Sequence, residues 1–523
     1  MEGDEDLLKI PAFGKLIALL EEQSRELEQL KAEIKRLKGH PGKPVIRPSS
    51  LEKEQNKNKT TDAETERDKE SRKCSKKPNL KIHQREKIKA TDVPPGAVFK
   101  GYAKVIIQDL EIKAKNTLYL LETWCTTEGK YIKAQLPASL QGGDFGPVIK
   151  SFILYQYHHC HVTQPLLYEQ LQEFGVSMST GQISRILTEN KEGFHQEQAD
   201  ILATALEVAS YIQCDDTGAR HQGKNGYCTF IGNDFFSYFK TTESKSRINF
   251  LELLRGGCTE YHVNRDALRY MQEQKLPFQT MQFLASADES VFADKAAWDK
   301  CLKELNITSP HAVRIATEGA LVGSILTHGI NKNLAVVSDD AGQFNILKHA
   351  LCWIHAERNI QKLECYTPEQ EKELEKILSA FWQLYQDLKA YQSNPVSKKT
   401  KALEAAFDAI CQTKTHWLAL EQALKKLASN KSELLLVLKR PEIPLHNNTS
   451  ERDIREYVKR RKISGSTRSE AGRDSRDAFT SLKKTCRKLQ ISFWAYLNDR
   501  ISLTNTIQAL SIILRGKFVY SSA

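Results

Sequence analysis

One stretch of the sequence reads Leu445-His446-Asn447-Asn448-Thr449-Ser450-Glu451-Arg452 and continues Asp453-Ile454-Arg455-Glu456-Tyr457-Val458-Lys459-Arg460-Arg461-Lys462. Its Asn, Thr and Ser side chains can accept hydrogen bonds from the first free backbone N–H groups of a helix, so the stretch predicts a helix start. At about 100° per residue, Arg455, Lys459 and Lys462 fall within roughly 80° of Glu451 on one helical face. A structural helix would carry an apolar stripe there. One carboxylate within a basic stripe instead favours a site that holds a metal ion together with a polyanion.

The composition predicts several domains and a polyanionic partner. The chain has 523 residues, a formal net charge of +11 and 11 cysteines. This length predicts two to four domains, and the positive charge indicates non-specific attraction to polyanions. Cysteines without a CxxC pair do not form the pattern of a disulfide framework, so we expect free thiols in a reducing cytosol. No secretory signal is evident, and the apolar segment 501–514 is too short to span a bilayer, so a soluble intracellular protein without membrane contact is expected.

The N-terminal part predicts a short coiled coil over 1–38 followed by a disordered basic linker over 39–95. Leu20, Leu27 and Ile34 repeat every seven residues. About three heptads are marginal for a stable zipper, so a single helix packed on its own domain is the alternative to dimerisation. The linker is rich in Lys, Glu, Asn, Ser and Pro, which cannot bury enough apolar area to fold.

Two regions with different periodicity follow the linker. Residues 96–146 predict a small β-rich region with strands at 103–107, 117–121 and 131–134. Residues 147–208 predict a helical region in which two helices and a glycine break resemble a helix-turn-helix. These helices are expected at 165–171 and 179–187. Because such helix pairs are also common in proteins where they have only a structural role, both DNA contact and a structural role stay open.

The region 209–500 predicts a mixed α/β core with helical insertions. The expected order is three antiparallel strands, a helix, an inserted segment, a strand, a helical insert and the helix that carries Glu451. The expected strands are 211–215, 227–232, 235–239 and 334–338, the first helix is 245–254, and the inserts are 258–330 and 368–440. Residues 501–523 are left as a C-terminal tail.

Three acids stand where these elements would bring them to one cleft. Asp215 and Asp339 follow strands, and Glu451 lies on the later helix. Carboxylates in this arrangement can hold two Mg²⁺ ions about 3.5–4 Å apart, which suits displacement at a phosphodiester. An aspartate at a strand end is also a frequent turn former, and this is the structural alternative.

The same residues resemble the insertion-sequence-66 family of bacterial transposases. The resemblance lies in Asp215-Asp216-Thr217-Gly218, in Ser338-Asp339-Asp340, and in the box from Leu445 to Arg452 with Arg460-Arg461-Lys462. It covers roughly 145–500 and implies a ribonuclease-H-like catalytic domain of the DDE group. It further implies that Asp215, Asp339 and Glu451 are the catalytic and metal-binding acids. Asp216 and Asp340 leave a one-residue ambiguity, although strand alternation favours Asp215 because Ile212 and Cys214 should point into the core.

The function implied by this resemblance is DNA transposition. We expect Mg²⁺-dependent cleavage at the 3′ ends of an insertion sequence, then strand transfer into target DNA, with Mn²⁺ able to replace Mg²⁺. The expected partners are transposon-end and target DNA, a second copy of the chain and accessory proteins, in the bacterial cytoplasm at the nucleoid. A ribonuclease-H-like nuclease that cannot join DNA and an inactive DNA-binding relative are the alternatives. The candidates for phosphate contacts are Arg452, Arg455, Lys459, Arg460, Arg461 and Lys462.

Three groups of possible metal ligands need separate treatment. The family usually has a four-cysteine zinc element after the linker, but only Cys125 lies near that place, so a structural zinc is not expected there. Neighbouring side chains in His158-His159-Cys160-His161 should point apart, which disfavours a shared ion. In Cys352-Trp353-Ile354-His355, core packing of Cys and Trp is the favoured interpretation, and a metal or DNA role is the alternative.

Overall fold

The computed structural model describes residues 81–91, 94–141 and 143–521 and divides the chain into two units, 1–106 and 107–523. In the first unit, the described residues 81–91 and 94–106 are exposed and form neither helix nor strand. The predicted coiled coil over 1–38 and most of the predicted linker lie outside the described residues. In the described part of the chain, no helix is both long and apolar enough to cross a membrane.

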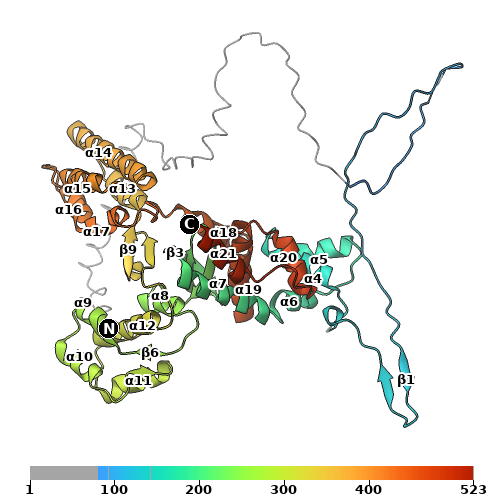
Figure 1. The fold of residues 1–523 in the computed structure, drawn as a ribbon, viewed down its shortest axis with the longest axis horizontal. Coiled ribbons are helices and arrows are strands. Elements are labelled where there is room, and N and C mark those ends of the chain that lie inside the picture. The colour runs from blue at the N-terminus through green and yellow to red at the C-terminus, as the bar shows by residue number, and fades with distance from the viewer. Residues whose placement is uncertain (1–80, 92–93, 142, 522–523) are drawn as a thin grey trace, which may run out of the picture. The chain divides into compact units, whose positions relative to one another are not determined.

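A five-stranded mixed sheet lies at the centre of the second unit (Figure 1). Its strand order is β5-β4-β3-β8-β9, with β3, β4 and β5 antiparallel and with β8 and β9 parallel to β3. The strands are β3 (Tyr211–His221), β4 (Lys224–Gly232), β5 (Ser237–Thr242), β8 (Ala335–Ser338) and β9 (Lys348–Leu351). The predicted mixed α/β class is therefore confirmed. The expected elements follow one another in the predicted order, but β9 is a further strand that was not predicted.

Two turns set the register of the antiparallel strands. Gln222 and Gly223 both have positive φ, 49° and 78°, as a two-residue hairpin turn between β3 and β4 requires. The turn between β4 and β5 is longer than predicted. Phe236 is buried within this loop instead of starting a strand, so β5 begins at Ser237 rather than at 235.

The two faces of the sheet carry different cores. On β3, Ile212 and Cys214 are fully buried in the main core with residues of α7 (Glu192–Val208) and of α12 (Pro310–Thr327). The opposite face packs against α18 (Asn448–Ser464), where Phe230 and Phe239 meet Tyr457. This alternation leaves Asp215 on the α18 side of the sheet, as predicted from the strand period.

Helices surround the sheet in three groups (Figure 1). The first group, with the C-terminal helices, comprises α4 (Pro147–His158), α5 (Gln164–Glu173), α6 (Thr180–Thr188), α7, α19 (Glu470–Lys488), α20 (Phe493–Ile501) and α21 (Leu510–Ser521). The second comprises α8 (Arg247–Leu254), α9 (Arg265–Glu273), α10 (Phe278–Ala285), α11 (Lys295–Glu304) and α12, with strands β6 (Tyr261–His262) and β7 (Val291–Phe292). The third comprises α13 (Trp353–Gln361), α14 (Pro368–Ser393), α15 (Ser397–Cys411), α16 (Leu418–Ser429) and α17 (Lys431–Leu434). Short 3₁₀ turns are η1 (Ala138–Leu140), η2 (Gly342–Phe344) and η3 (Leu436–Leu438).

Two sequence predictions outside the sheet were wrong in detail. No strand forms at 103–107 or 117–121, where Val105 and Leu118 are about 79% and 85% exposed. Strand propensity has no effect there because neither segment has a face to bury. Instead β1 (Thr123–Cys125) pairs with β2 (Tyr131–Lys133), the latter at a predicted position. The segment called a tail contains α21, which packs on α7 and buries Leu510 and Leu514.

A buried ionic cluster fastens α18 to α19 and to β5. Asp453 accepts a hydrogen bond of 2.8 Å from the Ser237 hydroxyl and lies 2.6 Å from the Lys488 ammonium and 3.3 Å from that of Lys484. Burial acts to raise the pKa of Asp453, but the two lysines hold it below its usual value. Removal of one partner from such a cluster leaves an uncompensated buried charge.

We therefore expect Asp453→Ala to lower the free energy of unfolding by about 3–5 kcal/mol, because Lys484 and Lys488 lose their counter-charge in a buried site. Denaturant unfolding of the full-length protein measures this loss. The control is Asp288→Ala, whose exposed side chain predicts a change within about 0.5 kcal/mol. Equal effects of the two substitutions would contradict the structural role of the cluster.

Candidate active site

The loop before α18 is held between β3 and the start of α13. The Asn447 side-chain amide donates to the Cys214 carbonyl on β3 at 2.8 Å, and its backbone N–H donates to the Cys352 sulfur at 3.2 Å. The Gln213 amide donates to the His446 carbonyl at 3.0 Å, and the Trp353 N–H donates to the Leu445 carbonyl at 2.9 Å. The loop therefore fixes the first turn of α18 against two other elements.

This arrangement corrects the predicted helix start. Asn447 is the N-cap residue of α18, but its side chain makes no capping hydrogen bond because the amide is directed to β3. The Ser450 hydroxyl donates to the Asn447 carbonyl at 2.8 Å instead of accepting from a free N–H group. The polar residues of this box therefore join separate elements rather than only starting a helix.

Asp215 lies on β3, and Asp339 directly follows β8, the neighbouring parallel strand. The register pairs Tyr211 with Ala335 and Gln213 with Val337, so its continuation by two residues places Asp339 opposite Asp215. Burial raises the pKa of Asp215 to about 7, the Asp216 N–H opposes this rise, and the charges of Asp339 and Glu451 add to it. The three predicted acids therefore lie close enough to act on one another electrostatically.

The two neighbouring aspartates have other partners. Asp216 is paired with the Lys245 ammonium and accepts a hydrogen bond of 2.7 Å from the Gln343 amide. Asp340 is paired with the Lys426 ammonium on α16. The geometry thus favours Asp215 and Asp339 over the adjacent residues at both ambiguous positions.

Glu451 faces three basic side chains from two helices. Its carboxylate lies 3.6 Å from His355 Nε2 and 3.4 Å from an Arg358 guanidinium nitrogen, both on α13. Arg455, one turn later on α18, lies 3.9 Å away and is about 64% exposed. Glu451 itself is only about 19% exposed, so its charge is balanced mainly by α13.

The sequence did not predict His355 as a site residue, although it offered a signal. Cys352 and Trp353 are buried and hydrogen-bonded, which is the packing role that was favoured for them. His355 lies one turn further along α13 and faces the acids. Burial lowers the pKa of His355, while the charges of Glu451 and Asp339 act in the opposite direction. The Cys-x-x-His spacing was the available clue, because it places His355 beside the residue that anchors the Asn447 loop.

The six predicted phosphate contacts separate into two sets. Arg452, Arg455, Lys459 and Lys462 are exposed on α18. Arg460 is about 4% exposed, stacks over the Tyr157 ring at 3.9 Å and donates to the Tyr157 carbonyl. Arg461 donates to the Gly218 carbonyl on β3. These two arginines therefore hold α18 in place, and only the four exposed residues are placed to meet a DNA backbone.

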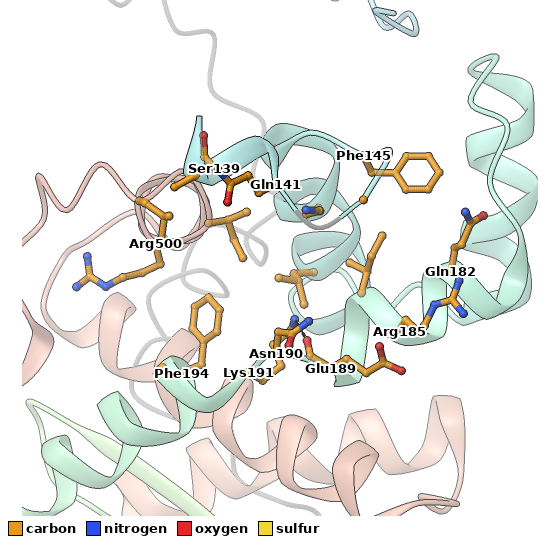
Figure 2. A pocket seen from close by; sticks show the side chains of 18 of the residues that line it. Ser139, Gln141, Phe145, Gln182, Arg185, Glu189, Asn190, Lys191, Phe194 and Arg500 are labelled. Carbon is orange, nitrogen blue, oxygen red and sulfur yellow. Dashed lines mark hydrogen bonds between the residues drawn. The ribbon is translucent and has the colours of Figure 1, made fainter. Parts of the chain in front are cut away.

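The helix-turn-helix-like pair forms α5 and α6, joined by Gly175 with a φ of 76°. A cavity of about 650 Å³ beside α6 is bordered by Gln182 and Arg185, with Arg500 on another wall (Figure 2). None of the three acids lines it.

The side chains of the run His158-His159-Cys160-His161 have separate partners. His158 stacks on Phe479 at 4.3 Å, and His161 contacts Glu456 on α18 at 2.8 Å. These histidines diverge, as predicted.

The raised pKa of Asp215 gives a prediction for the metal-free protein. A free carboxyl titrates near 4 and the folded one at about 7, so folding is progressively penalised as pH rises from about 4 to 7. We expect Asp215→Asn to raise the Tm by a few degrees at pH 8 in EDTA, with the gain shrinking toward pH 5. Thermal unfolding at both pH values measures it, and a gain that is larger at pH 5 would contradict the assignment.

Comparison with known proteins identifies the family. Residues 331–475 match the model described as Transposase IS66 family, a range that includes Asp339, Glu451 and α13 to α18. The chain is also 42% identical over 320 residues to the uncharacterized protein y4jO of Sinorhizobium fredii (strain NBRC 101917 / NGR234). That alignment covers 61% of this chain and the whole of the relative. The chain belongs to the IS66 family of transposases.

Proposed function

We propose that this protein cleaves the 3′ ends of an insertion sequence and transfers them into target DNA, with Asp215, Asp339 and Glu451 as the catalytic acids. The observation that carries the proposal is the convergence of these acids from β3, β8 and α18. Family membership supports DNA as the substrate. The strand order β5-β4-β3-β8-β9 supports a ribonuclease-H-like core.

The donor set of this site fits Mg²⁺ or Mn²⁺. The three acids offer only hard carboxylate oxygens, and their mutual repulsion is part of what raises the pKa of Asp215. Two bound ions would activate the attacking water or 3′-hydroxyl and stabilise the leaving oxygen. Asp215 and Asp339 would supply ligands from the sheet, and Glu451 would supply one from α18. Asp215 must lose its proton to bind a cation, so metal affinity is expected to rise with pH up to about 7.

His355 and Arg358 act on this site through Glu451. Both lie on α13 within 3.6 Å of the Glu451 carboxylate, and Cys352, the N-cap residue of that helix, accepts a hydrogen bond from the Asn447 N–H. We assign them a positioning role, which is to keep the Glu451 carboxylate from turning into solvent. With a cation held by Glu451, Arg358 would also be able to contact a phosphate, because its side chain is about 42% exposed.

The exposed basic side chains of α18 would bind the DNA backbone beside the three acids. Arg455 and Lys462 share the face of Glu451, Lys459 lies at its margin and Arg452 flanks it. Contacts of this kind position DNA without reading its sequence. We further propose that the protein acts as at least a dimer on two DNA ends. It would act with accessory proteins at the bacterial nucleoid.

The deciding experiment is cleavage and joining of a labelled DNA end taken from the flanks of the gene, with Mg²⁺ or Mn²⁺. We expect Asp215→Asn, Asp339→Asn and Glu451→Gln each to abolish both reactions while DNA binding persists, because these acids hold the metal and not the backbone. Asp216→Asn and Asp340→Asn are matched controls that remove the adjacent carboxylates.

Each outcome of that assay has one meaning. Cleavage by the wild type without joining would replace the transposase proposal with a nuclease. Binding without cleavage would favour an inactive DNA-binding relative. Cleavage that survives one of the three substitutions would remove that acid from the triad.

The exposed basic residues of α18 predict how DNA affinity depends on salt concentration. Loss of one phosphate contact should reduce the slope of log K against log salt by about 0.9 for duplex DNA. We expect Lys459→Ala and Lys462→Ala each to produce this reduction with any DNA sequence. Lys332→Ala, an exposed lysine on another part of the unit, should leave the slope unchanged. An unchanged slope in all three variants would place the DNA path elsewhere.

A further inference from the structure

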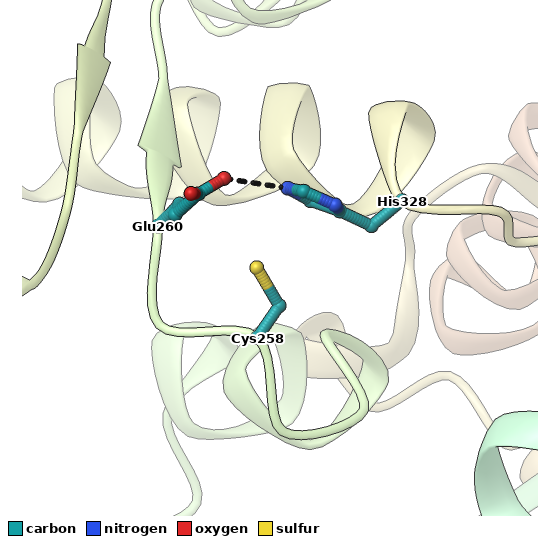
Figure 3. A group of neighbouring side chains, drawn as sticks. All are labelled: Cys258, Glu260 and His328. Atoms are coloured by element: carbon teal, nitrogen blue, oxygen red, sulfur yellow. Dashed lines mark hydrogen bonds and ion pairs between the residues drawn. The ribbon is translucent and has the colours of Figure 1, made fainter.

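A cluster of potential metal ligands lies at the neck of the insert between α8 and β8, away from the three acids. Cys258 follows α8, Glu260 precedes β6, and His328 follows the last residue of α12 (Figure 3). His262, the last residue of β6, contacts both Glu260 and His328. Cys258 and His328 therefore stand at the two ends of this insert. The Cys258 sulfur, a Glu260 carboxylate oxygen and a His328 ring nitrogen all lie within 4.8 Å of one another.

The distances among Glu260, His262 and His328 are close to those of ligands around one small ion. Glu260 Oε2 lies 3.0 Å from His262 Nε2 and 2.9 Å from His328 Nε2, and the two ring nitrogens are 3.2 Å apart. A tetrahedral ion with bonds of about 2.0–2.1 Å places neighbouring nitrogen and oxygen ligands about 3.3 Å apart. The remaining polar contact is between the Cys258 sulfur and the Ser324 hydroxyl, at 3.9 Å.

Without an ion, hydrogen bonds can hold this triangle of atoms. The Glu260 carboxylate oxygen can accept from Nε2–H of both His262 and His328, at 3.0 and 2.9 Å. With both rings unprotonated at Nε2, the three atoms instead present their lone pairs to one another, and a cation among them would satisfy all three.

We propose that Cys258, Glu260, His262 and His328 bind a structural Zn²⁺ ion. A thiolate and two imidazoles favour zinc over magnesium, which prefers oxygen ligands. Four protein ligands leave no position for a substrate, so this ion has no part in phosphodiester chemistry. His262 is about 10% exposed, whereas Glu260 and His328 are about 40% and 36% exposed, so the ion can enter from solvent on that side.

The ion would link the two ends of the insert. It ties the chain leaving α8 to the chain that leaves α12 and enters β8, the strand that precedes Asp339. Closing a long segment at its neck lowers the entropy of the unfolded chain, so metal binding contributes to folding free energy. The site is distinct from the four-cysteine element whose absence the sequence indicated near Cys125.

The test is Co²⁺ substitution and Zn²⁺ analysis of the full-length protein under reducing conditions. We expect about one tightly bound Zn²⁺ per chain and, with Co²⁺, a near-ultraviolet thiolate-to-metal absorption band. Cys258→Ser should abolish the band. His328→Gln and His262→Gln should each weaken Zn²⁺ affinity at least about tenfold, measured by competition with a chelator.

Matched controls separate this site from the rest of the molecule. Cys125→Ser and His311→Gln remove an exposed cysteine and an exposed histidine outside the cluster and should leave the band and the affinity unchanged. Asp215→Asn should also keep the band, because oxygen ligands do not produce it. A wild-type protein without bound Zn²⁺ or a thiolate band, or a band that survives Cys258→Ser, would overturn the proposal.

Discussion

The hydrogen bond from the Asn447 side chain to the Cys214 carbonyl is the constraint on which the candidate active site depends. Cys214 precedes Asp215 on β3, and Asn447 lies one turn before Glu451 at the start of α18. One buried amide therefore sets the distance between an acid on the sheet and an acid on the helix. The Asn447 N–H contact with Cys352 extends the same constraint to α13, which supplies His355 and Arg358.

Local patterns predicted four of the five strands of the sheet. The choice of Asp215, Asp339 and Glu451 as catalytic acids rested on the family resemblance and stays a prediction. Strand alternation distinguished Asp215 from its neighbour, since Ile212 and Cys214 had to be buried. The basic stripe on α18 followed from helical periodicity alone. Mixed topology followed from the order of strands and helices, and the sheet has that topology.

Long-range contacts were not accessible in the same way. Helical periodicity places Arg460 about 180° from Glu451, away from the face that Lys459 borders. Its stacking on Tyr157 could not be predicted, because only the folded chain brings α4 beside α18. Asn447 matched a capping residue by position, but β3 competes for its amide. Of the proposed ligands around Glu260, His328 is separated from the others by a whole insert, so no spacing motif marks the complete set.

The buried cluster around Asp453 has a consequence for the order in which the protein matures. Its lysines lie on α19, and β5 also needs α19, because the Ser237 N–H donates to the Thr485 hydroxyl at 3.1 Å. During synthesis, α18 is translated before α19, whose Lys484 and Lys488 neutralise Asp453. A nascent or truncated chain that ends before α19 therefore carries all three candidate acids while Asp453 still lacks the lysines that balance its charge.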